Sequence, residues 1–323
     1  MNTMLNLDNA ILSDRNGMYG GTTSPKEGII LDDEYWLVKY PKRLKLISTS
    51  DMTYSASPLS EYIGSHIYKI LGFNVHDTAL GIRHNRVVVA CKDFCTSAGE
   101  LREIRTLKNI YAEELKNELE LKSESHDEGS VYVTQLNELL LHFTYNPVLS
   151  SVKGLEERFW DCLLIDALIQ HGDRNSGNWG LLFKNGLYEL APVFANGSAF
   201  SPQLSDAQMI EIMAAEDTFR NYSLHIITAY GSNGHHFDLK YFLSRDDCKG
   251  LERSIIKLVP IITERFSQIE ALIQCIPDSH DGVTVCSPAR KRFYIEGMRT
   301  RIDTLLVSAY ERILYAYHNY PAY

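Results

Sequence analysis

The sequence predicts an α+β protein with a small β-rich part followed by a larger, mostly helical part. Two observations support this prediction. The first hundred residues contain short runs of β-branched and aromatic residues, whereas most segments after residue 97 carry apolar residues at helical spacing. A chain of 323 residues can bury a large core and is long enough for two domains. We place the boundary at residue 95, which gives domains of residues 1–95 and 96–323.

Two strands joined by a turn, and a third strand, are predicted in the β-rich part. IILDDEYWLVKY, residues 29–40, has two apolar runs separated by an acidic turn at Asp32 and Asp33. RVVVACKDF, residues 86–94, is enriched in β-branched residues and is the third strand.

A helix is predicted between these strands, over residues 57–72. Ser57 can act as its N-cap, Pro58 suits the first helical position, and Gly72 is a typical stop. An apolar stripe at helical spacing runs along the segment. The expected order is therefore strand, strand, helix, strand.

The rest of the chain is predicted to be mostly helical. Residues 98–122 carry alternating charges with spaced Leu and Ile, and residues 154–170, GLEERFWDCLLIDALIQ, have the pattern of a buried helix. From Ser205 onward most segments again favour helices, including residues 291–318.

One hairpin is predicted at the centre of the chain. NWGLLFKNGLYELAPVF holds two apolar runs separated by Asn185 and Gly186, a dipeptide that accepts the positive φ values of a type I′ turn. The register set by this turn would pair Asn178 with Val193. Residue 195 would then emerge close to Asn178.

Composition and targeting signals restrict the class of protein. The chain is 45% hydrophobic and 23% charged, as in ordinary globular proteins. A net charge of −9 argues against nucleic-acid binding through phosphate neutralisation, and the six cysteines, which include no CxxC, are expected to be reduced. The N-terminus has no signal-peptide pattern, and no apolar run reaches the roughly 20 residues that cross a bilayer. We expect a cytoplasmic protein without membrane or direct nucleic-acid partners, with secretion as an effector left open.

The loop before the hairpin carries side chains suited to phosphoryl transfer. That reaction needs a carboxylate to orient the acceptor hydroxyl and oxygen ligands for Mg²⁺. Asp173 is the candidate base, and Asn178 offers a hard carbonyl oxygen of the kind that binds Mg²⁺. Their five-residue spacing matches the kinase pattern H-R-D-x-x-x-x-N, although Asp and Asn are also common in turns. Arg174 either contacts phosphate or braces the loop.

The β-rich part offers a second set of candidate residues, suited to a nucleotide. NGMYGGTTSPKEG, residues 16–28, has glycines that let backbone N–H groups approach phosphate, and Lys26 at its end. Lys39 lies in the apolar run YWLVKY, where an uncompensated ammonium is costly, so it needs an anion. Glu61 on the predicted helix is the candidate partner. The alternative for Glu61 is a solvated side chain that interacts with the helix dipole.

Together these pieces resemble a known kinase family. RFWDCLLIDALIQHGDRNSGNWG, followed by LYELAPVF and NGSAF, is similar to the catalytic core of HipA-like serine/threonine kinases, especially their short CtkA-like members. YGGTTSPK, WLVKYP, SEYIGSHIYKILG and VVACKDF occur in the same order, so the resemblance covers residues 15–205. It implies a protein-kinase-like two-lobe fold, with a small β-rich N-lobe, a larger mostly helical C-lobe, and ATP and Mg²⁺ as cofactors.

The resemblance also implies a role for each candidate residue. Asp173 becomes the catalytic base and Asn178 a Mg²⁺ ligand. Lys39, paired with Glu61, becomes the contact to the α- and β-phosphates. Some members autophosphorylate a serine of the phosphate loop, and by this resemblance Thr22, Thr23 and Ser24 are candidate sites here. The other implied nucleotide contacts are Gly20, Gly21, Thr22, Ser24 and Lys26 in the phosphate loop, and backbone groups of Lys92 and Phe94 at the hinge.

Position 195 departs from the family pattern. The family has an Asp after LAPVF as its main Mg²⁺ ligand, and this chain has Ala195. A methyl group cannot coordinate a cation, and even loss of an outer-shell partner costs about 10- to 100-fold in metal affinity or activity. We therefore expect this chain to be inactive or severely impaired. The persistence of the other site residues favours a single introduced substitution; the alternative is a natural nucleotide-binding pseudokinase.

Two further functions compete with a protein kinase. A phosphoinositide-like lipid or small-molecule kinase has a similar catalytic loop, but the sequence shows no basic amphipathic helix for a membrane, which favours a protein substrate bearing Ser or Thr. A non-catalytic module that only holds nucleotide is the other alternative. HipA-like kinases commonly act as toxins restrained by antitoxins, so the resemblance adds an antitoxin as a candidate partner.

Overall fold

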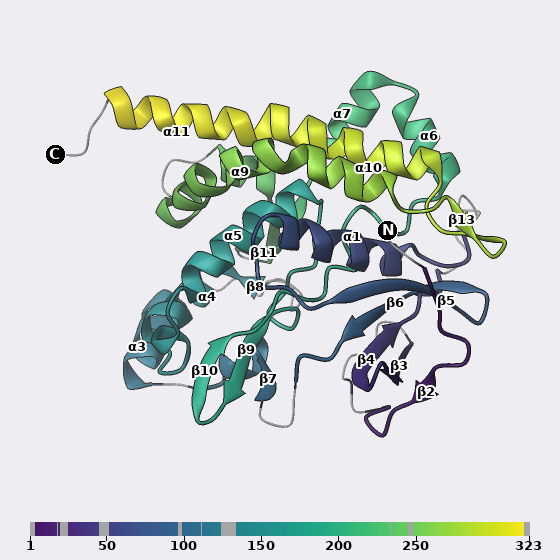
Figure 1. Cartoon of the computed structure of the whole chain (residues 1–323). Coiled ribbons are helices and arrows are strands. Elements are labelled where there is room, and N and C mark those ends of the chain that lie inside the picture. The colour runs from purple at the N-terminus through teal and green to yellow at the C-terminus, as the bar shows by residue number, and fades with distance from the viewer. Residues whose placement is uncertain are drawn as a thin grey trace. The chain divides into compact units, whose positions relative to one another are not determined.

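A computed structural model of the chain describes residues 4–17, 19, 25–44, 52–95, 99–110, 112–123, 134–232, 234–244 and 248–319 (Figure 1). The chain forms two compact units, each assembled from separate stretches of sequence. The first unit comprises Met1–Phe94, Pro192–Ser223 and Ile261–Thr300, and the second comprises Cys95–Ala191, Leu224–Pro260 and Arg301–Tyr323. The lobe boundary at residue 95 stays a prediction.

A six-stranded sheet forms the framework of the first unit, with the strand order β1-β5-β6-β4-β3-β2. All neighbouring strands are antiparallel except β1 and β5, which are parallel. Asp32 and Asp33 form the turn between β3 and β4 with φ values of 51° and 60°, so the predicted acidic turn is confirmed. The strands are β1 (Leu5–Asn6), β2 (Ile11–Leu12), β3 (Lys26–Leu31), β4 (Glu34–Lys39), β5 (Thr78–Arg83) and β6 (Arg86–Lys92).

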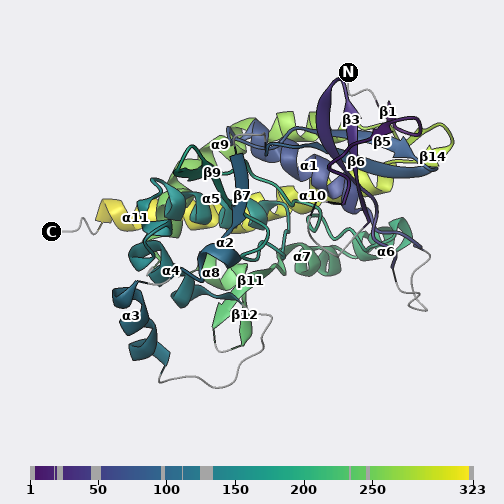
Figure 2. The ribbon, with the colours of Figure 1, turned by 90° about the horizontal axis from the view of Figure 1, so that it is seen from below.

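Helix α1 (Ser57–Ile70) packs against β5 and β6 (Figures 1 and 2). The predicted helix is confirmed, but its N-cap is Ala56 rather than Ser57. The Ser57 hydroxyl instead lies 2.9 Å from the Ser55 hydroxyl. Gly72, with φ of 95°, follows the helix in the left-handed region that glycine adopts without steric cost.

The rest of the first unit is mainly helical. A complete capping box begins α6, because the Ser205 hydroxyl accepts from the Gln208 backbone N–H and the Gln208 side chain accepts from the Ser205 N–H. A continuous helical stretch runs from residue 288 to residue 319 and passes into the second unit at residue 301. The elements are α6 (Asp206–Met213), α7 (Glu216–Leu224), α9 (Lys249–Gln274), which begins in the second unit, β13 (Ser279–His280), β14 (Val283–Thr284) and α10 (Pro288–Arg301). A π-helical turn (Ile302–Leu306) and α11 (Val307–Asn319) follow in the second unit.

The predicted hairpin of the second unit is present, with β9 (Gly180–Lys184) paired antiparallel to β10 (Leu187–Leu190). Asn185 and Gly186 form its turn with φ values of 52° and 80°. The ladder ends earlier than predicted, however, and Asn178 does not pair with Val193. Val193 instead forms a parallel bridge with Val75, and its N–H donates to the Asn74 carbonyl at 2.8 Å.

A strand that the sequence did not predict, β7 (Gly99–Glu103), pairs with β9 (Figure 2). The charge pattern predicts helix from residue 98. The five residues satisfy their backbone groups on the open edge of the hairpin, and this tertiary contact outweighs the helical charge pattern. The helical prediction holds only further along the chain, in α2 (Ile104–Leu107) and α3 (Glu113–Ser123).

Helix α5 (Leu155–Leu168), predicted as a buried helix, has eleven buried residues and is central to the second unit. A second sheet, β12-β11-β8, was not predicted. No helix in the described part of the chain has both the length and the apolar character needed to span a membrane. The remaining elements are β8 (Thr134–Gln135), α4 (Leu136–Tyr145), a 3-10 turn (Leu149–Ser151), β11 (Ile227–Ser232), β12 (His235–Asp238) and α8 (Leu239–Leu243).

Candidate active site

Lys39 and Glu61 form an ion pair in the first unit, with Nζ 3.0 Å from Oε2. Lys39 ends β4, and Glu61 lies in the first half of α1. The Lys39 side chain is 19% exposed and Glu61 is only 3% exposed. The alternative of a solvated Glu61 is therefore wrong, because the sheet and neighbouring chain segments cover this face of α1.

The Glu61 carboxylate is held in its charged form. Burial by itself would raise the pKa of Glu61, but the adjacent Lys39 ammonium and the His76 ring hold that pKa well below its ordinary value. Nε2 of His76 lies 3.2 Å from Oε1, the carboxylate oxygen that is not paired with Lys39. Each oxygen of Glu61 thus faces its own nitrogen.

A second lysine lies on the same face of the sheet as Lys39. Lys26 on β3 is the direct cross-strand partner of Lys39, so the two side chains leave the sheet on one side. Like charges at such a position repel each other. Two ammonium groups on one face of the sheet suit an anionic ligand.

The segment after position 195 packs against Glu61. A Cβ added to Gly197 would lie 3.2 Å from Glu61 Oε2, so glycine permits this close approach. Asn196 is completely buried and donates from Nδ2 to the Ser65 hydroxyl at 2.9 Å. Ser65 lies one turn along α1 from Glu61, where the sequence offers small residues. The chain that follows position 195 is therefore fixed to the same face of α1 as the ion pair.

Ala195 itself has a φ of 61°, in the left-handed region. Among residues with a side chain, Asp and Asn adopt this region most readily, and alanine is disfavoured there. The backbone at position 195 thus has the conformation that an aspartate tolerates, while the side chain has no oxygen.

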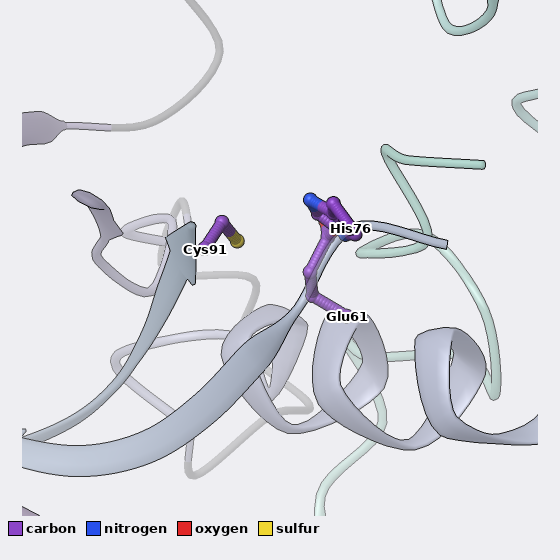
Figure 3. Close-up of side chains that lie close together, drawn as sticks. All are labelled: Glu61, His76 and Cys91. Carbon is purple, nitrogen blue, oxygen red and sulfur yellow. The ribbon is translucent and has the colours of Figure 1, made fainter. Parts of the chain in front are cut away.

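Glu61, His76 and Cys91 bring three potential metal ligands together within 4.8 Å, and Figure 3 shows their side chains turned toward one another. Such a set could in principle bind Zn²⁺. Two features oppose this. Lys39 already neutralises Glu61, and burial raises the pKa of the Cys91 thiol to about 12, which disfavours the thiolate that a metal needs. We therefore interpret the group as a buried ion-pair cluster and not as a metal centre.

The two hinge candidates, Lys92 and Phe94, lie at and after the end of β6. The Lys92 N–H donates to the Asp77 carbonyl at 2.8 Å, so its carbonyl is the backbone group that could contact a base. The Lys92 ammonium lies 3.2 Å from Glu34. The Phe94 ring packs against Phe194 with a centroid distance of 5.8 Å.

The four other phosphate-loop candidates, Gly20, Gly21, Thr22 and Ser24, lie outside the described residues, as does the proposed autophosphorylation segment at residues 22–24.

Asp173 and Asn178 lie in the second unit, on the loop between α5 and β9. The Asn178 side-chain amide donates from Nδ2 to the Asp173 carbonyl, which directs its Oδ1 oxygen away from that contact. The Asp173 side chain is exposed and accepts from the Asn175 amide at 2.7 Å. The loop thus presents one carboxylate and one amide oxygen.

Arg174 anchors this loop to α5. Its Nε and Nη2 each lie 2.9 Å from an oxygen of Asp166 on α5, and both residues are at least 96% buried. Its Nη1 also donates to the Asn178 carbonyl at 3.4 Å. Of the two roles considered for Arg174, bracing is the one the geometry favours.

Sequence reasoning missed His76, Ser65 and Asn196, which surround Glu61. The small residues at positions 64 and 65 were the available signal, because they allow another segment to approach α1. The pairing of His76 with Glu61 had no signal, since it depends on the bridge between Val75 and Val193 that positions the segment before β5.

The chain is similar to a known kinase in both sequence and structure. No family model matches the chain. The serine/threonine-protein kinase CtkA of Helicobacter pylori is 30% identical over 263 residues, which cover 80% of this chain and 75% of CtkA. The crystal structure of the H. pylori proinflammatory kinase CtkA matches with a TM-score of 0.81 at 26% identity, over 97% of this chain and 98% of that chain.

A more distant match shows the fold alone. It is a structure of the Shewanella oneidensis toxin-antitoxin proteins HipA and HipB with operator DNA, with a TM-score of 0.54 at 13% identity, over 91% of this chain and 67% of that chain. Together with the CtkA match, it confirms the predicted α+β, protein-kinase-like fold.

Proposed function

Because the chain belongs to the HipA-like serine/threonine kinase family, we propose that its site binds ATP with Mg²⁺ and serves to phosphorylate Ser or Thr of a protein. We further propose that Ala195 leaves this particular chain severely impaired in the transfer step. A carboxylate at position 195 would then be enough to make the site competent.

The observation that carries this proposal is the cationic face built by β3, β4 and α1. Lys26 and Lys39 are cross-strand partners, and Glu61 pairs with Lys39. A polyphosphate could pair with both ammonium groups, and Glu61 would hold the Lys39 side chain in the orientation that meets it.

The second unit supplies the groups expected to act on the acceptor and the cation. Asp173 is an exposed carboxylate on a braced loop, which suits a base that orients a substrate hydroxyl. Asn178 has its amide nitrogen engaged with the Asp173 carbonyl, so its Oδ1 is the atom suited to a hard cation such as Mg²⁺. Bound Mg²⁺ would supply neutralisation of charge on the phosphates.

Position 195 is proposed as the site of the second metal ligand. Its left-handed backbone suits Asp, and the following residues are fixed to α1 beside Glu61. Because Ala195 has only a methyl group, Asn178 is the one of the two proposed ligand positions whose side chain carries an oxygen.

We place this activity in the cytoplasm, where ATP is present. The match to a HipA structure that also contains HipB supports the search for a regulatory protein partner. Affinity purification of the chain from its own host, followed by identification of stoichiometric partners, would test that part of the proposal separately from catalysis.

The experiment that tests the function compares Ala195→Asp with the double variant Ala195→Asp/Asp173→Asn. We expect Ala195→Asp to transfer labelled γ-phosphate to Ser or Thr residues in a host lysate when Mg²⁺ is present. The double variant should lose this transfer while keeping its nucleotide affinity. Absence of transfer by Ala195→Asp, or equal transfer by both variants, would contradict the proposal, and transfer to lipid in place of protein would select the lipid-kinase alternative.

A further inference from the structure

His76 occupies a place that the kinase scheme leaves unassigned. It lies between α1 and β5, is 6% exposed, and directs Nε2 to within 3.2 Å of Glu61 Oε1 (Figure 3). Lys39 takes the other oxygen, Oε2, at 3.0 Å. The orientation of the carboxylate that meets Lys39 is thus fixed from its far side by the histidine ring.

The ring must carry its proton on Nε2 for this contact to be favourable. Burial lowers the pKa of His76, although its contact with Glu61 acts in the opposite direction, so the imidazole is neutral near pH 7. A neutral ring has one N–H and one bare nitrogen. A bare nitrogen 3.2 Å from a carboxylate oxygen would be repulsive, whereas the partial positive charge of an N–H attracts that oxygen. The contact is electrostatic, because Glu61 Oε1 makes no hydrogen bond within the described part of the chain.

The same ring connects Glu61 to the chain that follows position 195. Nε2 of His76 is also 3.1 Å from the Ser65 hydroxyl, which accepts from the Asn196 amide at 2.9 Å. All of these groups are buried. The segment before β5 is also bonded to that chain, because the backbone N–H of His76 donates to the Val193 carbonyl at 3.2 Å.

We propose that His76 is a positioning residue of the nucleotide site. It holds the Glu61 carboxylate in the orientation that directs Lys39, and it couples that orientation to the chain segment carrying position 195. This inference rests on the proposed kinase function for its catalytic consequence, but the contact between His76 and Glu61 can be tested without it.

His66 offers a matched control on the same helix. It is a half-buried histidine whose pKa is lowered by burial, and its ring packs against Tyr62 with a centroid distance of 4.1 Å. No contact between His66 and Glu61 is present among the described residues. A His66→Phe variant therefore removes an imidazole from the same helix without removing a contact to the Glu61 carboxylate.

The first test measures the contact by a double-mutant cycle in the chain as it stands. Leaving a buried carboxylate oxygen without its nearby N–H costs about 1–3 kcal/mol, so His76→Phe should lower the folding equilibrium constant about 5- to 100-fold. In a Glu61→Gln background the same change should cost less than about 3-fold, because the charge is already absent. An equal cost in both backgrounds would overturn the proposed contact.

The second test measures the functional consequence in the Ala195→Asp background. We expect His76→Phe to lower kcat/KM for ATP at least 10-fold, and His76→Gln, which restores an N–H donor, to recover most of that loss. His66→Phe should change kcat/KM less than 3-fold. If His76→Phe and His66→Phe behave alike while Ala195→Asp is active, the positioning role is wrong. If Ala195→Asp neither binds nor turns over ATP, the kinase proposal and with it the positioning role fail, and the cycle alone still decides whether the contact exists.

Discussion

Replacing Glu61 with Gln is the perturbation whose effect follows most directly from the ion-pair geometry. Glutamine keeps the shape of the side chain but removes the charge, so Lys39 loses its carboxylate partner at 3.0 Å while its side chain remains 81% buried. Lys26, opposite Lys39 in the sheet, carries the same charge and repels the Lys39 ammonium. The folded state of the first unit should therefore be destabilised.

The magnitude can be bounded from burial. Removing one partner of a fully buried ion pair costs about 3–5 kcal/mol, because the other charge is left uncompensated. Lys39 keeps partial access to water, which places the expected cost at the lower end, about 3 kcal/mol. This corresponds to a change of roughly 100-fold in the unfolding equilibrium of the first unit.

Glu34→Gln is the matched control. Glu34 pairs with Lys92 at 3.2 Å on the same sheet, but their side chains are 56% and 35% exposed, and such surface pairs contribute about 0–1 kcal/mol. Urea unfolding followed by hydrogen exchange on peptides from β4 and α1 would report the first unit separately. An equal cost for the two variants would refute the reasoning that Glu61 compensates a buried ammonium.

Three further predictions concern pH, loop packing and loop bracing. The pKa of folded Glu61 lies well below its ordinary value of 4.5, so its stabilising contribution is complete above pH 4.5 and is lost as the pH falls through the lowered pKa. The stability difference between the original chain and Glu61→Gln should therefore shrink between pH 7 and pH 3. A constant difference in urea titrations would contradict this. Gly172→Ala would place a Cβ 2.7 Å from the Ile227 carbonyl oxygen and should cost about 1–3 kcal/mol in denaturation experiments, whereas Gly99→Ala meets nothing nearer than 4.0 Å and serves as control. Asp166→Asn leaves the buried Arg174 guanidinium without its carboxylate, so hydrogen exchange at residues 171–178 should accelerate at least 10-fold, and unchanged protection would show that Arg174 does not brace the loop.

Local sequence signals predicted the elements whose structure is decided by short-range chemistry. The turn at Asp32 and Asp33 and the turn at Asn185 and Gly186 follow from residues that tolerate positive φ. Helix α5 follows from its continuous apolar pattern. The need of Lys39 for an anion was also visible, because an ammonium in an apolar strand is costly without one.

The features that sequence reasoning missed depend on contacts between distant segments. Strand β7 exists because the hairpin offers an open edge, and nothing within its five residues distinguishes it from the helical pattern that follows. Val193 was expected to extend the hairpin, but it pairs with Val75, and this bridge brings His76 toward Glu61. Hydrophobic period and turn chemistry carry no information about such partners.

The most direct measurement of the central claim is the affinity of a fluorescent ATP analogue, with and without Mg²⁺, for the chain and for Ala195→Asp. We expect the chain with Ala195 to bind the nucleotide with an affinity that Mg²⁺ hardly changes, because one metal ligand is missing. In Ala195→Asp, Mg²⁺ should tighten nucleotide binding by at least 10-fold. Loss of a partner of the metal costs about 10- to 100-fold in metal affinity or activity, which corresponds to about 1.4–2.8 kcal/mol. An Mg²⁺ effect of equal size in both proteins, or no nucleotide binding by either, would contradict the assignment of position 195 to the metal site.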